Sequence, residues 1–529
     1  MDGLHLGIDV GGTHTDGVAV NLREGKVVRK VKSQTTPDLR QCSMEALEKL
    51  LAGLPASSVS RVVISTTLVT NAVATKRLEP AGLIIMSGPG MNPSFMTSQP
   101  YCHLAMGAMD HRGREIIPID PREIDRILEN LSFKGISVVA VAGKFAGRNP
   151  SHELAIGALA DRLFDHVALA HRLSGSLNFP RRVATAHLSA SLWRRQREFV
   201  SSLSASGREH SIEAPLYLLG ANGGAALAGS FHNAAETALS GPAASIMGVM
   251  ALDSLEGETI ALDVGGTTTD ISLFVGAVPL LEPHGATIGD YKTQIRSLFN
   301  RSAAIGGDSE VKCVKGRLAI GPLRKGPAKS LGGPEPTPTD AMILLGLTEG
   351  DRAAAREALA GLASALSKSP EECAKAILRE MGATIASALA EFVAEVNKKP
   401  VYTIKELLAG HKVSPRRAVL VGGPARAIEK YVEEALGIPV LVPPHFEVAN
   451  AIGAAVAGVN LEVNGLADTA IGSLSIPEAG VYREVQKSYS MAQLHAECFD
   501  SIKKLALEMG LTESDFEPDV VESESFNII

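Results

Sequence analysis

The sequence is poor in cysteine and in aromatic side chains. Five cysteines occur in 529 residues, none of them in a Cys-x-x-Cys pair, and aromatic residues make up 4% of the chain with a single tryptophan. This spacing argues against a disulfide framework, an iron–sulfur cluster and a structural zinc site. We therefore expect reduced thiols in a reducing compartment.

The sequence also lacks an excess of positive charge and a long apolar run. The net charge is -7, and no stretch of 18 or more apolar residues is present. A nucleic-acid backbone favours a basic protein face, and a membrane span needs an apolar segment, so we expect neither nucleic acid nor membrane as a partner. A strand is expected to begin by about Leu4, which leaves no room for a signal peptide. We therefore expect a cytoplasmic protein.

The P-loop pattern G-x-x-x-x-G-K-[ST] is absent as well, and the chain instead contains a different short motif twice. Asp9 begins Asp-Val-Gly-Gly-Thr-His-Thr-Asp and Asp263 begins Asp-Val-Gly-Gly-Thr-Thr-Thr-Asp, which are identical at seven of eight positions. In each copy a short apolar strand ends in Asp, followed by a Gly-Gly pair, hydroxyl residues and a second strand. This order predicts a β-hairpin with a bare polar tip, and its repetition indicates two related halves.

Two such hairpins, facing each other across a cleft, suit a polyphosphate. Glycines allow backbone N–H groups to approach a ligand, threonine hydroxyls add donors, and a carboxylate at a strand end can hold hydrated Mg²⁺. The alternative is a pair of plain tight hairpins. The candidate phosphate-binding residues are Gly11, Gly12, Thr13, His14, Thr15, Gly265, Gly266, Thr267 and Thr268. Asp9 and Asp263 are the candidate metal ligands, and we expect Asp16 and Asp270 to orient water or a hydroxyl group.

Several motifs, in their order along the chain, resemble the hydantoinase A/5-oxoprolinase family. They are Leu6–Asp16, Ser65–Ala72, Asp110–Gly113, Leu239–Ala243 and Leu262–Asp270, and the similarity covers roughly residues 4–475. The family is part of the actin, sugar-kinase and heat-shock-chaperone ATPase superfamily. The resemblance implies an α/β fold with two duplicated actin-like (ribonuclease H-like) domains and a nucleotide cleft between them. It also predicts lobes over 1–190 and 191–475, with a C-terminal extension over 476–529.

The resemblance implies an enzyme that uses ATP and Mg²⁺ to open a cyclic amide such as a hydantoin or 5-oxoproline. A separate hydantoinase B-type subunit often completes the family's reaction, so we expect such a partner. The sequence leaves open whether the chain also forms a homo-oligomer. Two alternatives also stay open: a small-molecule kinase, and a nucleotide-gated regulatory subunit. Family members are usually longer than this chain, and the position of His14 is commonly aromatic in them.

Two further glycine-rich stretches are candidates for the nucleotide site. The stretch with Gly306 and Gly307 resembles a glycine-rich family region in degraded form. The strand, turn and helix around Gly422, Gly423 and Pro424 are similar to the superfamily's adenosine-contacting loop, although a tight turn between strand and helix is the alternative.

The remaining segments predict further strands and helices. We expect a strand near 215–219 to open the second half, core strands at 83–86 and 138–142 in the first lobe, and a helix over about 189–204 that leads between the lobes. The Ser65–Asn71 stretch is either a helix cap or part of the site. Cys102, His103, Asp110 and His111 raise the possibility of a metal site, although spacing alone does not show convergence. The last 17 residues carry six carboxylates and no Lys or Arg, which predicts a solvated tail.

Overall fold

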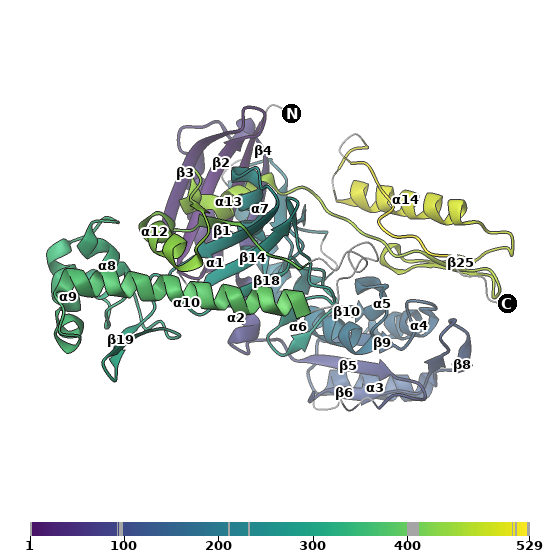
Figure 1. The fold of residues 1–529 in the computed structure, drawn as a ribbon. Coiled ribbons are helices and arrows are strands. Elements are labelled where there is room, and N and C mark those ends of the chain that lie inside the picture. Colours follow the sequence, from purple (N-terminus) through teal and green to yellow (C-terminus); the bar gives the residue numbers. More distant parts are fainter. Residues whose placement is uncertain are drawn as a thin grey trace.

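The structure is a computed structural model that describes residues 3–36, 38–92, 94, 99–209, 212–230, 233–398, 412–509, 511–513 and 516–525. Two six-stranded sheets form its centre. Figure 1 shows α8 and α9 extending from one end of the molecule, and the C-terminal helix α14 lying near a smaller sheet at the other end.

The first sheet has the strand order β12-β11-β4-β1-β2-β3. Its strands are β1 (Leu4–Val10), β2 (His14–Asn21), β3 (Lys26–Gln34), β4 (Val59–Thr66), β11 (Leu216–Leu219) and β12 (Ala225–Leu227). Strands β1 and β2 form the predicted antiparallel hairpin, while β4 runs parallel to β1 and β11 runs parallel to β4. The expectation that the strand near 215–219 opens the second half is therefore wrong, because β11 belongs to the first sheet.

The second sheet repeats the order of most strands of the first, with β14, β13, β21 and β22 in the places of β2, β1, β4 and β11. Its path is β15-β14-β13-β21-β22, with β18 also paired to β14. The strands are β13 (Glu258–Val264), β14 (Thr269–Val275), β15 (Val278–Pro279), β18 (Asn300–Ala303), β21 (Arg417–Val421) and β22 (Val440–Leu441). Asp263 lies opposite Asp270 across its hairpin, as Asp9 lies opposite Asp16 in the first. The duplication predicted from the motif thus extends to the sheet around it.

Helices α7 (Ser240–Leu252) and α13 (Ala449–Val456) lie between the two sheets. One buried cluster joins residues of both helices to residues of β4, β11, β13 and β21. The helices cross with their backbones in contact, since a methyl group at Gly453 would lie 1.9 Å from the Ala244 carbonyl oxygen and one at Gly248 would lie 2.1 Å from that of Ala449. Larger side chains at these glycines would force the helices apart.

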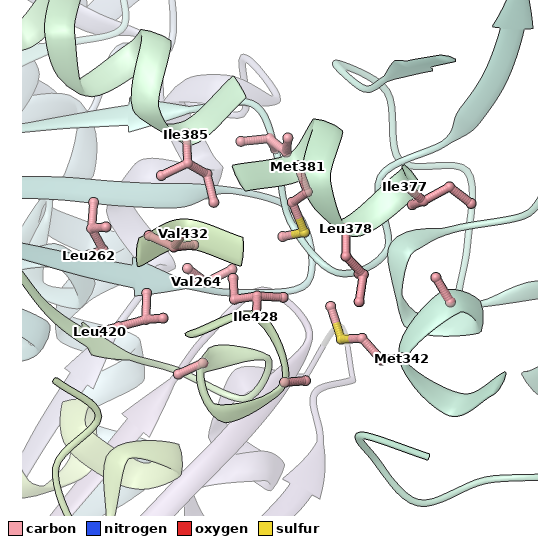
Figure 2. Packing of buried hydrophobic residues seen from close by; sticks show 14 of the residues in the cluster. Leu262, Val264, Met342, Ile377, Leu378, Met381, Ile385, Leu420, Ile428 and Val432 are labelled. Atoms are coloured by element: carbon pink, nitrogen blue, oxygen red, sulfur yellow. The ribbon is translucent and has the colours of Figure 1, made fainter. Parts of the chain in front are cut away.

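The outer face of the second sheet carries the largest core. Residues of the sheet form this core together with residues of α8 (Pro338–Leu345), α9 (Arg352–Ala365), α10 (Pro370–Lys398) and α12 (Ala425–Leu436). In Figure 2, Leu262 and Leu420 of the sheet meet Ile428 of α12 and Ile385 of α10. Burial of each such side chain contributes roughly 1.5–3 kcal/mol. Helices α9 and α10 lie in an alanine-rich stretch of the sequence, and alanine favours a helix.

A third, four-stranded parallel sheet is inserted between parts of the first. Its order is β10-β9-β5-β6. The strands are β5 (Ala81–Met86), β6 (Cys102–Leu104), β9 (Val138–Gly143) and β10 (His166–Leu169), and the neighbouring helices are α3 (Pro121–Phe133) and α4 (Ser151–Ala160). The strands expected at 83–86 and 138–142 are present, but they form this separate sheet and not the core of the first.

Helix α6 (Phe179–Glu209) connects the inserted sheet to the first sheet. Ala186 and Ala190 pack in the core beneath β5 and β9, whereas Phe199 and Leu203 pack beneath β1 and β4. The helix is longer than the 189–204 segment that the sequence predicts, and it links these two sheets.

The C-terminal segment folds into three strands and a helix. They are β23 (Leu466–Asp468), β24 (Ser473–Ile476), β25 (Val481–Glu484) and α14 (Met491–Glu508). The small sheet therefore begins before residue 476, where the sequence motifs place the start of the extension. Arg112, from the same part of the chain as the inserted sheet, donates two hydrogen bonds, of 2.8 and 2.7 Å, to the Asp468 carboxylate. These bonds hold the C-terminal segment against that part of the chain.

The other elements are short apart from α1. They are α1 (Leu39–Leu51), α2 (Leu68–Ala74), α5 (Ala170–Leu173), β7 (Ala108–Met109), β8 (Glu115–Ile117), β16 (Thr287–Ile288), β17 (Tyr291–Lys292), β19 (Val311–Val314) and β20 (Arg317–Ile320). Asp38 caps α1 by accepting a hydrogen bond from the Gln41 N–H. Among the described helices, none has both the length and the apolar character that a bilayer crossing requires.

Candidate functional site

The first hairpin has a tight tip held by its own backbone. The Gly11 N–H donates to the His14 carbonyl at 3.0 Å, and a methyl group at Gly11 would lie 2.9 Å from that oxygen. At Gly12 an added methyl would meet no described atom within 4 Å, so this part of the tip is open to a ligand. The buried Thr15 hydroxyl is instead bonded to that of Thr35, 3.0 Å away, and fixes β2 against the end of β3.

The second hairpin repeats this geometry, with Gly265 N–H donating to the Thr268 carbonyl at 2.9 Å. The predicted glycine stretch at 306–307 lies directly against it. Gly307 N–H donates to the Gly265 carbonyl at 2.9 Å, and the next residue, Asp308, donates its N–H to the Gly266 carbonyl at 2.7 Å. A methyl group at Gly306 would lie 2.6 Å from the Gly265 carbonyl oxygen, so only glycine permits this contact.

The predicted loop at 422–424 also reaches the second hairpin. Gly422 has a φ of 94°, and a methyl group there would lie 2.4 Å from the Val264 carbonyl oxygen and 2.7 Å from the Asp263 carboxylate. A methyl group at Gly307 would lie 3.2 Å from the Pro424 ring, while one at Gly423 would meet no described atom within 4 Å. The glycine-rich stretches, which are far apart in sequence, therefore gather around one strand end.

The carboxylates of the two hairpins meet at a residue that the motifs do not include. The Asn450 Nδ2 atom donates to Asp9 Oδ2 at 3.3 Å and to Asp263 Oδ2 at 3.1 Å. Asn450 is in the first turn of α13, between the two sheets. The tips are neighbours as well, because a methyl group at Gly266 would lie 3.6 Å from the Thr13 side-chain methyl carbon. The structure thus brings the two predicted hairpins to one place.

A positively charged side chain lies beside each hairpin. Lys32 is opposite Asp16 in the pairing of β2 with β3, and its Nζ lies 2.9 Å from the Asp16 carboxylate. Arg324 donates to the Asp308 carboxylate at 3.3 and 3.2 Å, next to the second tip. Nothing in the motifs points to these cations, although the strand alternation of β3 places Lys32 on the same face as Asp16.

Burial makes the carboxylates of the site hard to ionise. It raises the pKa of Asp9 to about 7, with the Asp16 and Asp263 charges adding to the shift and Ser65 and Asn450 opposing it. Burial also raises the pKa of Asp270 to about 7, with the Asp263 charge contributing, and it raises the pKa values of Asp16 and Asp263. A site of this kind favours a cation as a partner.

The Ser65–Asn71 stretch lies beside the first hairpin. The Thr67 hydroxyl donates to the Val10 carbonyl at 3.3 Å, and Thr66 N–H donates to the buried Ser240 hydroxyl at 3.0 Å. Ser240 begins α7, directly after Leu239, whose φ is 58°. The Leu239–Ala243 motif is therefore joined to the end of β4 next to the hairpin.

The polar residues at 102–111 do not join this site. Cys102 and His103 are on β6 of the inserted sheet, and Asp110 accepts hydrogen bonds from the Arg112 and Arg114 N–H groups. Within the described part of the chain there is no group of three or more His, Cys, Asp or Glu residues placed to hold a metal ion. The structure therefore gives no support to a metal site at these four residues, which the sequence spacing alone did not establish.

The donor set at the hairpins fits Mg²⁺. Among the described residues, the buried Asp9 Oδ1 atom has no hydrogen-bond partner, and Asp263 presents a second carboxylate beside it. Mg²⁺ commonly takes one or two protein carboxylates and completes its shell with phosphate and water oxygens, so a third protein ligand is not required. Two lobes of the same strand order, each with a glycine hairpin at this carboxylate pair, define the class: the actin-like ATPase fold.

The chain belongs to the hydantoinase/oxoprolinase family. Residues 182–463 match the family's hydantoinase/oxoprolinase model, and residues 5–164 match the model of its N-terminal region. The family resemblance of the sequence motifs is thereby confirmed.

Three curated relatives show how much of the chain is shared. It is 23% identical to the uncharacterized protein MJ0964 of Methanocaldococcus jannaschii, over 85% of this chain and 72% of that protein. It is 28% identical to 5-oxoprolinase 1 of Arabidopsis thaliana, over 65% of this chain and 29% of that protein. It is 24% identical to caprolactamase subunit alpha of Pseudomonas jessenii, over 83% of this chain and 68% of that subunit. The chain thus spans less than a third of 5-oxoprolinase 1.

Two solved structures share the fold over most of the chain. One is a nucleotide-free acetone carboxylase, with a TM-score of 0.69 and 18% identity, over 88% of this chain and 72% of that one. The other is the ATP-dependent caprolactamase of Pseudomonas jessenii, with a TM-score of 0.69 and 19% identity, over 97% of this chain and 85% of that one. At these identities the likeness establishes the fold.

Proposed function

We propose that this protein binds Mg-ATP between its two lobes and uses it to open a cyclic amide of the hydantoin, 5-oxoproline or caprolactam type. The observation that carries the proposal is the meeting of Asp9 and Asp263, one from each duplicated hairpin, at Asn450. Relatives named 5-oxoprolinase and caprolactamase support the substrate class.

The reaction uses ATP because an amide is a poor electrophile. Transfer of the γ-phosphoryl group to the amide oxygen breaks the bond between the β and γ phosphates and gives a phosphorylated imidate and ADP. Water then attacks the activated carbon, and the carbon–nitrogen bond of the ring breaks to leave a free amine and an acyl phosphate. A second water hydrolyses the acyl phosphate to a carboxylate and inorganic phosphate. One ATP and two waters are consumed per ring.

The residues of the chain act mainly by positioning and by electrostatics. We assign the binding of phosphate oxygens to backbone N–H groups at the two tips, those of Gly12 and Thr267; the space around Gly12 supports this assignment. Asp9 and Asp263 would hold Mg²⁺, which when bound would supply positive charge beside the phosphates. We assign to Asp16 and Asp270 the orientation of water or of the substrate oxygen.

We further propose that the chain acts as the nucleotide-binding subunit of a two-component enzyme. Its relative in Pseudomonas jessenii is named as a subunit alpha, which implies at least one further subunit in that enzyme. The chain covers 29% of 5-oxoprolinase 1, so that relative contains further residues that could form the substrate side of the site. We therefore expect weak ring opening by the chain alone, and full activity with a hydantoinase B-type partner.

The test is release of phosphate from Mg-ATP with a panel of hydantoin, 5-oxoproline and caprolactam, measured with and without the candidate partner. Formation of one ring-opened product for each phosphate released supports the proposal. A stable phosphorylated product would instead identify a small-molecule kinase, and slow hydrolysis that no small molecule stimulates would identify a regulatory subunit. Absence of Mg-ATP binding in calorimetry would refute all three.

A further inference from the structure

Asn450 is the one described side chain that donates hydrogen bonds to the metal-site carboxylates of both hairpins. Its amide nitrogen carries two hydrogens and lies 3.3 Å from Asp9 Oδ2 and 3.1 Å from Asp263 Oδ2. Each carboxylate therefore receives one N–H from the same group. Because both bonds end on Oδ2 atoms, Asp9 Oδ1 is left without a partner among the described residues.

The backbone around Asn450 is fixed from two sides. The carbonyl of the preceding residue, Ala449, touches Gly248 of α7, and the carbonyl of the following residue, Ala451, touches Gly7 of β1. Methyl groups at these glycines would lie 2.1 and 2.0 Å from the two oxygens, so the helix backbone packs directly against the backbone of α7 on one side and of β1 on the other. The amide is thus held at a set position relative to both sheets.

We propose that Asn450 is a positioning residue for the metal, which turns one carboxylate oxygen of each lobe toward the ion and couples the two lobes. This inference rests on the proposed function. Outer groups that orient metal ligands commonly account for a 10–100-fold change in metal affinity when they are removed. Among the described residues, the side-chain hydrogen bonds of Asn450 go to these two carboxylates and to no glycine or threonine of the hairpin tips. Its loss should therefore weaken the metal-dependent part of nucleotide binding alone.

The experiment measures binding of a fluorescent ADP analogue to the full chain during a Mg²⁺ titration, and again in EDTA. Asn450→Leu keeps the approximate shape and removes both donors, whereas Asn450→Ser is smaller and keeps one hydroxyl donor. The matched control is Asn464→Leu, because the Asn464 amide also donates to a carboxylate, Glu478 at 2.8 Å, but does so in the C-terminal segment.

We expect the Mg²⁺ concentration at half-saturation to rise 10–100-fold in Asn450→Leu and less in Asn450→Ser, with affinity in EDTA and in the control unchanged. If Asn450→Leu does not fold, the serine variant alone decides the question. An unchanged Mg²⁺ midpoint, or an equal loss in EDTA, would overturn the inference. Absence of Mg²⁺-dependent binding by the unaltered chain would instead refute the proposed function.

Discussion

The crossing of α7 and α13 offers a sharp test of how the site is built. In Gly453→Ala, the new methyl group would lie 1.9 Å from the Ala244 carbonyl oxygen and 2.5 Å from the Gly248 nitrogen. Both are backbone atoms, so no side chain can rotate away. Since non-bonded heavy atoms settle about 3.5–4 Å apart, the helices must separate by more than about 1 Å. Such overpacking costs roughly 1–3 kcal/mol.

The same movement should reach the site, because Asn450 is three residues before Gly453 in α13. We therefore expect Gly453→Ala to lower the melting temperature and to weaken Mg-nucleotide binding together. The matched control is Gly361→Ala on the exposed face of α9, where an added methyl meets no described atom within 4 Å. There the substitution should raise stability by about 0.5–1 kcal/mol, because alanine favours a helix over glycine.

Thermal unfolding and titration of a fluorescent ADP analogue measure both effects. If Gly453→Ala melts at the temperature of the unaltered protein, the close crossing is not a feature of the folded chain. If it melts lower but binds Mg-nucleotide as before, α13 does not position the site.

Three further predictions concern the charged groups of the site. Asp263→Ala should abolish Mg-ATP hydrolysis while circular dichroism stays native, and retained turnover would remove Asp263 from the metal. Lys32→Met and Arg324→Met should each weaken ATP binding about 10-fold or more, by removing a cation beside one hairpin; unchanged affinity in calorimetry would show that these cations serve only Asp16 and Asp308. Burial raises the pKa of Asp9 and of Asp270 to about 7, from an ordinary value of 3.8, so the folded metal-free protein binds protons that the unfolded chain releases. Its stability should fall as pH rises from about 4 to about 7, and less so in Asp270→Asn; a melting temperature equally pH-dependent in both proteins would contradict this.

The local motifs predicted the two hairpins well. A strand that ends in Asp, then Gly-Gly and hydroxyl residues, is readable because turn residues and side-chain alternation act over a few positions. The pKa values of the four carboxylates could not be predicted in this way, because burial depends on the whole fold.

The sequence by itself determined that two equivalent hairpins exist and that each ends in a carboxylate. Only the tertiary structure decided which other residues join them. Asn450 is 441 residues from Asp9 and 187 from Asp263, and β11 pairs with β4 although the sequence pattern places it in the second half. Parallel strand pairing and helix crossing are set by contacts between distant segments, which leave no period or motif in the local sequence. The local sequence therefore predicts the two hairpins, whereas the backbone contacts of α7 and α13 bring these hairpins and Asn450 together.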